Sequence, residues 1–294
     1  MALEIGIVYA LIATVLGGCS MYAIKRYLSG YGPATIGVIC SSVAAAVYSP
    51  VVFYAAAEAP LWSTLTGSEV AIVVGTALLG GVGFLLFLFA LASGDVSYVA
   101  PLAKIVPAFV LPIEIVLLQV FLTPLQTAGV VVVTVGLYLT NYQRGPLLEP
   151  FRRLLTYRPA QYALGSAGIY GLFDVSQRVI LQEIGFTPEL WVIITQVGIV
   201  LTLAPLMMQF GWTSQSIRNR WYGFVLVGTL NAAFAHFTIL AFGVLPASVA
   251  SPIVNAQSVV AVLLGGILLR EGSFRPRLIG AFVVVAGITL LVFG

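Results

Sequence analysis

Residues 97–118, SYVAPLAKIVPAFVLPIEIVLL, are long and apolar enough to cross a bilayer, yet they contain three prolines and two ionisable residues. Proline removes a helix hydrogen bond and frees a carbonyl oxygen four residues earlier. Within a membrane, a freed carbonyl oxygen or a charged side chain is tolerated only where protein or water faces it. We therefore expect Pro101, Lys104 and Pro107 to lie on a broken helix that faces a polar interior.

The same pattern recurs 151 positions later, in residues 248–269, SVASPIVNAQSVVAVLLGGILL. At this offset Pro101 corresponds to Pro252, and Lys104 corresponds to Asn255. The offset also relates two glycine pairs in the apolar stretches that follow, Gly129 with Gly280 and Gly136 with Gly287. Identity between the two parts is sparse, so the repeat rests on spacing and on these matched positions. We predict that the prolines mark two equivalent broken helices that gate a substrate path.

The composition places the chain in a membrane. Hydrophobic residues make up 60% of the sequence and charged residues 8%, whereas a soluble domain carries about 25% charged residues. The net charge of +3 is too small to indicate a nucleic-acid partner. The sequence contains none of the zinc-protease, nucleophile-elbow or Walker motifs, and Cys19 and Cys40 lie in apolar stretches. We expect an all-α polytopic membrane protein that is not an enzyme and holds no metal or cofactor.

Ten apolar stretches are predicted to span the membrane. They cover residues 4–24, 34–56, 69–92, 96–119, 124–143, 160–181, 189–210, 221–242, 248–269 and 277–293. They form a first five-helix repeat, residues 1–143, and a second, residues 160–294, joined by a polar connection, residues 144–159. Because five crossings are an odd number, the second repeat enters the membrane upside down. This inverted plan is typical of secondary transporters.

The basic residues predict the orientation. Eleven of the 13 Lys and Arg residues fall in loops on one side, and that side includes the connection 144–159. The loops of the other side carry glutamates and no unambiguous basic residue. By the positive-inside rule, the connection lies in the cytoplasm and both termini lie outside, in a multi-pass protein of the cell membrane.

Several polar side chains within these stretches are candidate substrate contacts. Lys104 in a wet cavity would attract a carboxylate or phosphate, or it pairs with a carboxylate of the protein. Asn255 and Gln257 offer donors and acceptors to a polar substrate, or they join neighbouring helices. Tyr22 and Tyr98 contribute to an aromatic lining, or they serve packing and the membrane interface.

Three ionisable residues are candidates for proton coupling. His236, the only histidine, suits a proton relay, although a hydrogen-bonded histidine between helices has the same sequence signature. Glu114 is a candidate for proton coupling, for an ion pair or for a position at a water-facing helix end. Asp174 lies four residues before Arg178, so an ion pair within one helix is expected for these two, and a place on the substrate path is the alternative for Asp174.

The chain resembles a known family in three segments, residues 90–109, 123–136 and 246–291. The first reads ALASGDVSYVAPLAKIVPAF, and the second reads TPLQTAGVVVVTVG. These segments are similar to EamA-type permeases of the drug/metabolite transporter superfamily. The Arg270–Glu271 turn also resembles that family, whereas the first half has Val120 at the matching place.

This resemblance implies a ten-helix secondary transporter, often an exporter of amino acids, metabolites or toxic cations. It also implies a central cavity with several of the candidates near it, with Tyr22 and Asp174 on its flanks. The residues placed near the cavity are Lys104, Asn231, His236, Asn255 and Gln257. Many members keep both termini in the cytoplasm, which differs from the orientation that the basic residues predict here.

We therefore expect a secondary transporter that moves a small polar or amphiphilic metabolite, amino-acid-like or an organic ion, by alternating access. Export is the favoured direction. A flippase for a lipid or lipid-linked precursor on the same fold is the alternative, and a membrane-embedded enzyme or scaffold fits less well. The sequence leaves open the substrate, the direction, proton coupling and whether the chain forms a homodimer.

Overall fold

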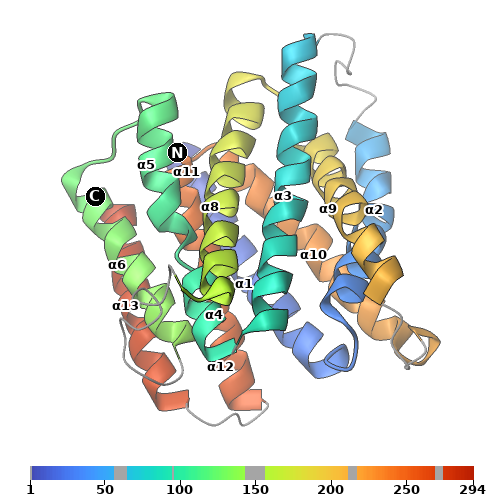
Figure 1. Cartoon of the computed structure of the whole chain (residues 1–294). Helices are drawn as coiled ribbons and strands as arrows, with labels where there is room; N and C mark the ends of the chain where they lie inside the picture. Colours follow the sequence, from blue (N-terminus) through green and yellow to red (C-terminus); the bar gives the residue numbers. More distant parts are fainter. Residues whose placement is uncertain (1, 56–64, 95, 143–155, 211–216, 269–273) are drawn as a thin grey trace.

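The computed structural model describes residues 2–55, 65–94, 96–142, 156–210, 217–268 and 274–294, and this part of the chain is helical without a strand (Figure 1). The helices are α1 (Ala2–Tyr27), α2 (Pro33–Ala55), α3 (Gly67–Ser93), α4 (Val96–Ala103), α5 (Val106–Leu118), α6 (Pro124–Asn141), α8 (Arg158–Arg178), the π-helix η2 (Val179–Glu183), α9 (Pro188–Phe210), the 3-10 helix η3 (Ile217–Arg220), α10 (Trp221–Phe242), α11 (Ala247–Asn255), α12 (Gln257–Leu268) and α13 (Phe274–Phe293). Their bounds agree closely with the predicted apolar stretches. The all-α prediction is confirmed.

Seven helical segments among the described residues are long and apolar enough to cross a membrane. They include the combined segments Val99–Leu118 and Ala247–Leu268, and a shorter apolar helix covers Arg277–Phe293. Large apolar side chains such as Phe53, Phe282 and Leu201 lie exposed on the outside of the bundle. Because lipid is the medium that such a surface requires, the protein is a multi-pass membrane protein. The count of ten crossings stays a prediction.

Both predicted helix breaks are confirmed. The first break interrupts the helix between α4 and α5, where the Lys104 amide donates to the Pro101 oxygen (3.2 Å) in a tight turn. The second lies between α11 and α12, where the Ala256 amide bonds to the Pro252 oxygen (3.3 Å) and the Ile253 oxygen (3.1 Å). The two broken helices begin at Val96 and Ala247 and therefore correspond at the same 151-residue offset.

Helix starts are encoded locally. Before α3, the Thr66 hydroxyl accepts a hydrogen bond from the Glu69 amide, and the Thr66 amide donates to the Glu69 carboxylate (2.7 Å). Before α6, Thr123 and Gln126 form the same reciprocal pair, and Pro124 occupies the first turn. These capping boxes satisfy amide groups that have no partner inside the helix, so they fix where α3 and α6 begin.

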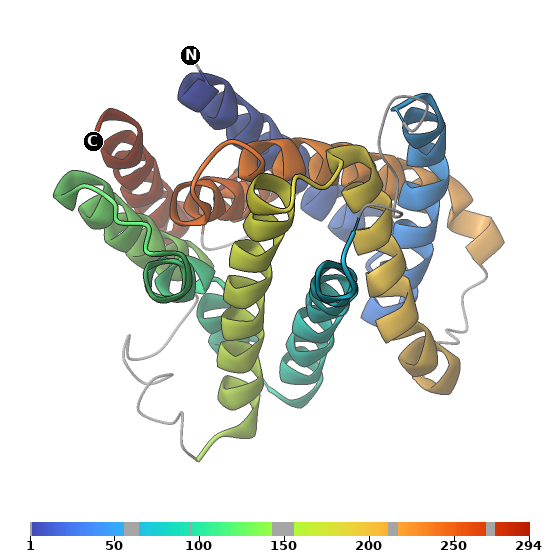
Figure 2. The same cartoon turned by 90° about the horizontal axis from the view of Figure 1, so that it is seen from above.

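Helices of the two halves pack in matched pairs. When the helices are matched in order, α1, α3 and α5 of the first half correspond to α8, α10 and α12 of the second half. The contact of α1 with α10 then matches that of α8 with α3, and the contact of α1 with α12 matches that of α8 with α5. The pairs α2 with α10 and α9 with α3 are likewise exchanged, whereas α2 meets α9 and α6 meets α13. Figures 1 and 2 both show α6 and α13 side by side at one flank. The most extensive contacts that one half makes thus have counterparts made by the other half.

The contact between α6 and α13 is antiparallel and close. A Cβ atom at Gly129 would lie 2.9 Å from the Gly287 carbonyl oxygen. A Cβ atom at Gly136 would lie 3.1 Å from the Gly280 oxygen. Small residues allow such close approach of helix backbones in membranes. The four glycines matched in the sequence therefore lie at one helix interface, where Gly129 faces Gly287 and Gly136 faces Gly280.

Candidate functional site

A cavity of about 320 Å³ lies between α1, α2 and α3 of the first half and α8, α9 and α10 of the second half. Its lining is mainly apolar and aromatic, with uncharged polar groups at several points. The aromatic residues are Phe84, Tyr170, Phe173 and Phe234, and the polar ones are Ser41, Gln177, Thr195, Gln196, Asn231 and Thr238. Concave, mostly apolar pockets with a few polar groups are the usual form of small-molecule sites.

Some polar groups of the cavity already have partners. The Asn231 Oδ1 accepts a hydrogen bond from the Ser20 hydroxyl (2.6 Å). Gln177 donates to the Asp174 carboxylate (3.3 Å), and the Thr195 hydroxyl donates to the Val192 oxygen (2.8 Å). These bonds hold the side chains in place within the helix bundle.

Three other polar side chains of the cavity have no hydrogen-bond partner within the described part of the chain. They are Ser41 on α2, Gln196 on α9 and Thr238 on α10. Ser41 is 5% exposed and Gln196 is 6% exposed, and the Thr238 hydroxyl oxygen is buried. Burial of an unpartnered polar group costs about 1–3 kcal/mol, so such groups call for an explanation. Their convergence on one cavity from three helices makes this cavity the candidate functional site.

The sequence analysis placed other residues at the cavity, and of those only Asn231 lines it. Lys104 is half-buried in the turn after α4. The Asn255 amide donates to the Ser251 oxygen of its own helix (3.0 Å), and Gln257 packs against Gly17 of α1. These residues mark the helix breaks. The expectation that they share this cavity with Asn231 is not met in this structure.

Two of the remaining candidates also lie outside the cavity lining. His236 points to α2, where its Nδ1 lies 2.6 Å from the Tyr48 hydroxyl, and its ring contacts Phe237 edge-on. Tyr22 is half-buried on α1. Tyr98 belongs to α4, and its side chain lies outside the described part of the structure, as do Arg270 and Glu271.

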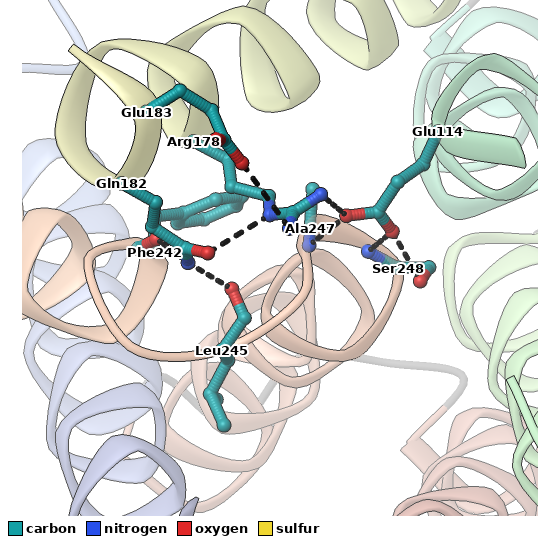
Figure 3. Close-up of polar contacts among 8 residues, drawn as sticks. All are labelled: Glu114, Arg178, Gln182, Glu183, Phe242, Leu245, Ala247 and Ser248. Carbon is teal, nitrogen blue, oxygen red and sulfur yellow. Dashed lines mark hydrogen bonds and ion pairs between the residues drawn. The ribbon is translucent and has the colours of Figure 1, made fainter. Parts of the chain in front are cut away.

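Glu114 is fully buried at the centre of a polar network that joins α5, α8 and the start of α11 (Figure 3). Its carboxylate accepts hydrogen bonds from the Ala247 amide (2.7 Å), the Ser248 amide (2.8 Å) and the Ser248 hydroxyl. The Arg178 guanidinium forms an ion pair with it at 3.0 Å. We call Glu114, Arg178, Gln182, Ala247 and Ser248 the Glu114 cluster.

The predicted ion pair between Asp174 and Arg178 is wrong, because Arg178 turns to Glu114. The π-helix η2 follows Arg178 directly and brings Gln182 beside it, where the Arg178 Nε donates to the Gln182 oxygen (3.1 Å). Gln182 in turn donates to the Phe242 and Leu245 oxygens (2.7 and 2.8 Å). Asp174 keeps Gln177 as its neighbour and lies next to Ser251 of α11.

Sequence reasoning missed most of the cavity. Ser41, Gln196 and Thr238 are uncharged residues within apolar stretches, so they lack the contrast of Lys104 or Glu114. Gln196 carried a usable signal, since a carboxamide in the middle of an otherwise apolar span requires a partner. No sequence feature indicated that these three residues from three helices meet.

Apolar helices that can span a membrane, packed around an internal cavity with polar groups, define the class of polytopic membrane transporters. Residues 4–142 match the sequence profile of the EamA-like transporter family. The resemblance stated from the sequence is confirmed. This match to a transporter family agrees with the class that the fold and the cavity indicate.

The fold has known counterparts. Among solved structures, 29 chains match the fold of this protein. One of them, described only as the crystal structure of a protein, aligns with a TM-score of 0.77 over 97% of this chain and 95% of that chain. The sequence identity is 14%, so this likeness shows the fold alone. No curated protein matches the sequence significantly.

Proposed function

We propose that the protein is a secondary transporter that moves a small molecule through the central cavity by alternating access. The cavity itself carries the proposal, because its wall consists of helices from both halves of the chain. A site between two packed halves changes its access when one half moves against the other. A membrane transporter needs such a site near the middle of its spans.

The helix packing supports an inverted repeat with ten crossings. Contacts between the halves occur in exchanged pairs, and α6 runs antiparallel to its counterpart α13. A two-fold relation between the halves accounts for both observations. The broken helices α4–α5 and α11–α12 then occupy equivalent positions, and we assign the gate to them. Lys104, Asn255 and Gln257 at the breaks, with Tyr22 and Tyr98, meet the substrate during passage rather than in the cavity.

Among the predicted proton carriers, Asp174 is best placed. Gln177 connects its carboxylate to the cavity wall, and Ser251 on the other side belongs to the broken helix α11. Glu114 is held by four donors, and His236 is held by Tyr48. We therefore assign coupling to Asp174. We further infer a cytoplasmic connection 144–159 and outward termini from the distribution of basic residues, and export from the family resemblance.

A cavity-filling substitution tests the proposal. Uptake of labelled amino acids, aromatic amines and aromatic amides is measured in proteoliposomes that contain the purified protein, with and without a proton gradient. Wild-type protein is expected to accumulate at least one of them, and Ala235→Phe, which fills the cavity from α10, to reduce the rate at least tenfold. Val285→Phe, at an exposed site on α13, is the control and retains transport. Absence of transport of every compound, or full activity of Ala235→Phe, would overturn the proposal.

A further inference from the structure

The lining of the cavity is uncharged. No carboxylate, ammonium, guanidinium or imidazole group occurs among the described residues that form its wall. A charged ligand that enters a low-dielectric site loses its hydration and recovers that loss only from a group of opposite charge. Lys104 and His236 do not line the cavity, and Asp174 lies behind Gln177. The cavity therefore offers a zwitterion or an organic ion no direct counter-charge.

The unpartnered groups in the wall define what a ligand has to supply. Ser41 presents a hydroxyl, and Gln196 presents both a carbonyl oxygen and an amide, whereas the Thr238 hydroxyl oxygen is buried within the wall. Asn231 uses its oxygen for Ser20 and so has its amide hydrogens available. A ligand with both a donor and an acceptor, such as a carboxamide, satisfies these groups, and the free energy of each new buried hydrogen bond favours binding.

The rest of the wall suits a flat apolar group. Four aromatic rings come from α3, α8 and α10, and the rings of Tyr170 and Phe173 stand edge to face. Edge-to-face and offset contacts are the arrangements that aromatic rings prefer. The volume of about 320 Å³ fits the lower end of small-molecule pockets, roughly 300–1,000 Å³.

We propose that the cavity binds an uncharged small molecule that combines an aromatic or similarly flat apolar part with a carboxamide or hydroxyl group. This inference rests on the proposed function, since it assigns a substrate class to the same cavity. It also narrows the expectation drawn from the sequence, because amino-acid-like zwitterions and organic ions fall outside the class.

Three probes of matched shape test the class. Phenylacetamide, phenylacetate and phenethylamine differ mainly in charge, being neutral, anionic and cationic near pH 7. Isothermal titration calorimetry of the purified full-length protein in detergent at this pH measures the Kd of each. Phenylacetamide is expected to bind at least tenfold more tightly than either ion. Equal or tighter binding of an ion, or no binding of any of the three, would overturn the assignment.

Variants locate the binding to the unpartnered groups. Gln196→Leu and Ser41→Ala are each expected to raise the Kd of phenylacetamide fivefold or more, because each removes a hydrogen bond to the ligand. Thr289→Val is the matched control, since its hydroxyl bonds within α13 on an exposed face. Circular dichroism checks that each variant is folded. An unchanged Kd in both cavity variants would contradict the assignment.

Transport of the same probes separates this proposal from the proposed function. If phenylacetamide binds selectively but is not moved across proteoliposomes with or without a gradient, the ligand class stands and the transport proposal fails for it. If the protein instead transports phenethylamine or phenylacetate in preference, the transport proposal stands and the uncharged class is overturned.

Discussion

The Glu114 cluster and the central cavity are two polar regions inside one helix bundle, and neighbouring residues of α8 belong to them. Gln177 lines the cavity, whereas Arg178 belongs to the cluster. In the cluster, the charged carboxylate has four donors around it. In the cavity, three uncharged side chains have no hydrogen-bond partner among the described residues. The difference indicates that the Glu114–Arg178 pair serves the structure of the bundle, whereas the neutral polar groups of the cavity are available to a ligand.

The position of Glu114 explains why a charge is stable there. Its carboxylate faces the first turn of α11, where amide groups have no partner within the helix and the helix dipole is positive. Arg178 supplies a full opposite charge at 3.0 Å. The cluster thereby fixes the start of a broken helix to α5 and α8, whereas Ser41, Gln196 and Thr238 of the cavity have no such partners among the described residues.

The largest effect is expected for Glu114→Ala. The substitution leaves Arg178 as a buried charge without its carboxylate and removes the acceptor of two α11 amides. Removal of one partner from a buried ion pair costs about 3–5 kcal/mol. Unfolding by sodium dodecyl sulfate, followed by circular dichroism, measures the loss in free energy of unfolding. If the variant does not fold, Glu114→Gln gives the same comparison with a smaller loss.

Glu183→Ala is the control for this substitution. Glu183 also approaches Arg178, at 3.9 Å, but its side chain is 60% exposed. Exposed ion pairs contribute at most about 1 kcal/mol. A loss at Glu183 equal to that at Glu114 would mean that burial and helix capping do not set the stability of the cluster.

An intermediate effect is expected for Gln182→Ala. The variant leaves the oxygens of Phe242 and Leu245 without their side-chain donor and frees Arg178 Nε. Loss of partners for partly buried polar groups corresponds to about 1–3 kcal/mol. The same unfolding titration measures it. A loss above that of Glu114→Ala would reverse the order of importance within the cluster.

The smallest effect on stability is expected for Thr238→Val in the cavity. Its hydroxyl has no partner to lose among the described residues, so the free energy of unfolding changes by at most about 0.5 kcal/mol or rises. Thr14→Val is the contrasting substitution, because the Thr14 hydroxyl donates to the Ile253 oxygen (2.6 Å) at the second helix break. That variant is expected to lose about 1 kcal/mol. Equal losses for the two would remove the distinction between partnered and unpartnered groups.

The sequence predicted the helices well for physical reasons. Hydropathy sets the position of each apolar helix, and prolines set the breaks, as Pro101 and Pro252 show. Both signals are local, so they can be read from one chain. The offset that relates Lys104 to Asn255 also recurs in the structure as equivalent ends of two broken helices.

The partners of polar groups could not be predicted in the same way. Arg178 has Asp174 one turn away on its helix, and the spacing rule predicts their pairing. The structure pairs Arg178 with Glu114, which is 64 residues distant in the sequence. Tertiary packing decides such contacts. For the same reason Lys104, the most conspicuous polar residue of the first broken helix, was placed in a cavity that it does not line.

The glycine contact between α6 and α13 has a consequence for how these two surfaces recognise each other. Gly129 meets Gly287, and Gly136 meets Gly280. Gly129 corresponds to Gly280 and Gly136 to Gly287 at the 151-residue offset, so both contacts join the same two equivalent positions. Such a surface is complementary to itself, which is the property that an isologous dimer requires. The surface that holds α6 against α13 within one chain therefore has the form that would also hold two separate copies together.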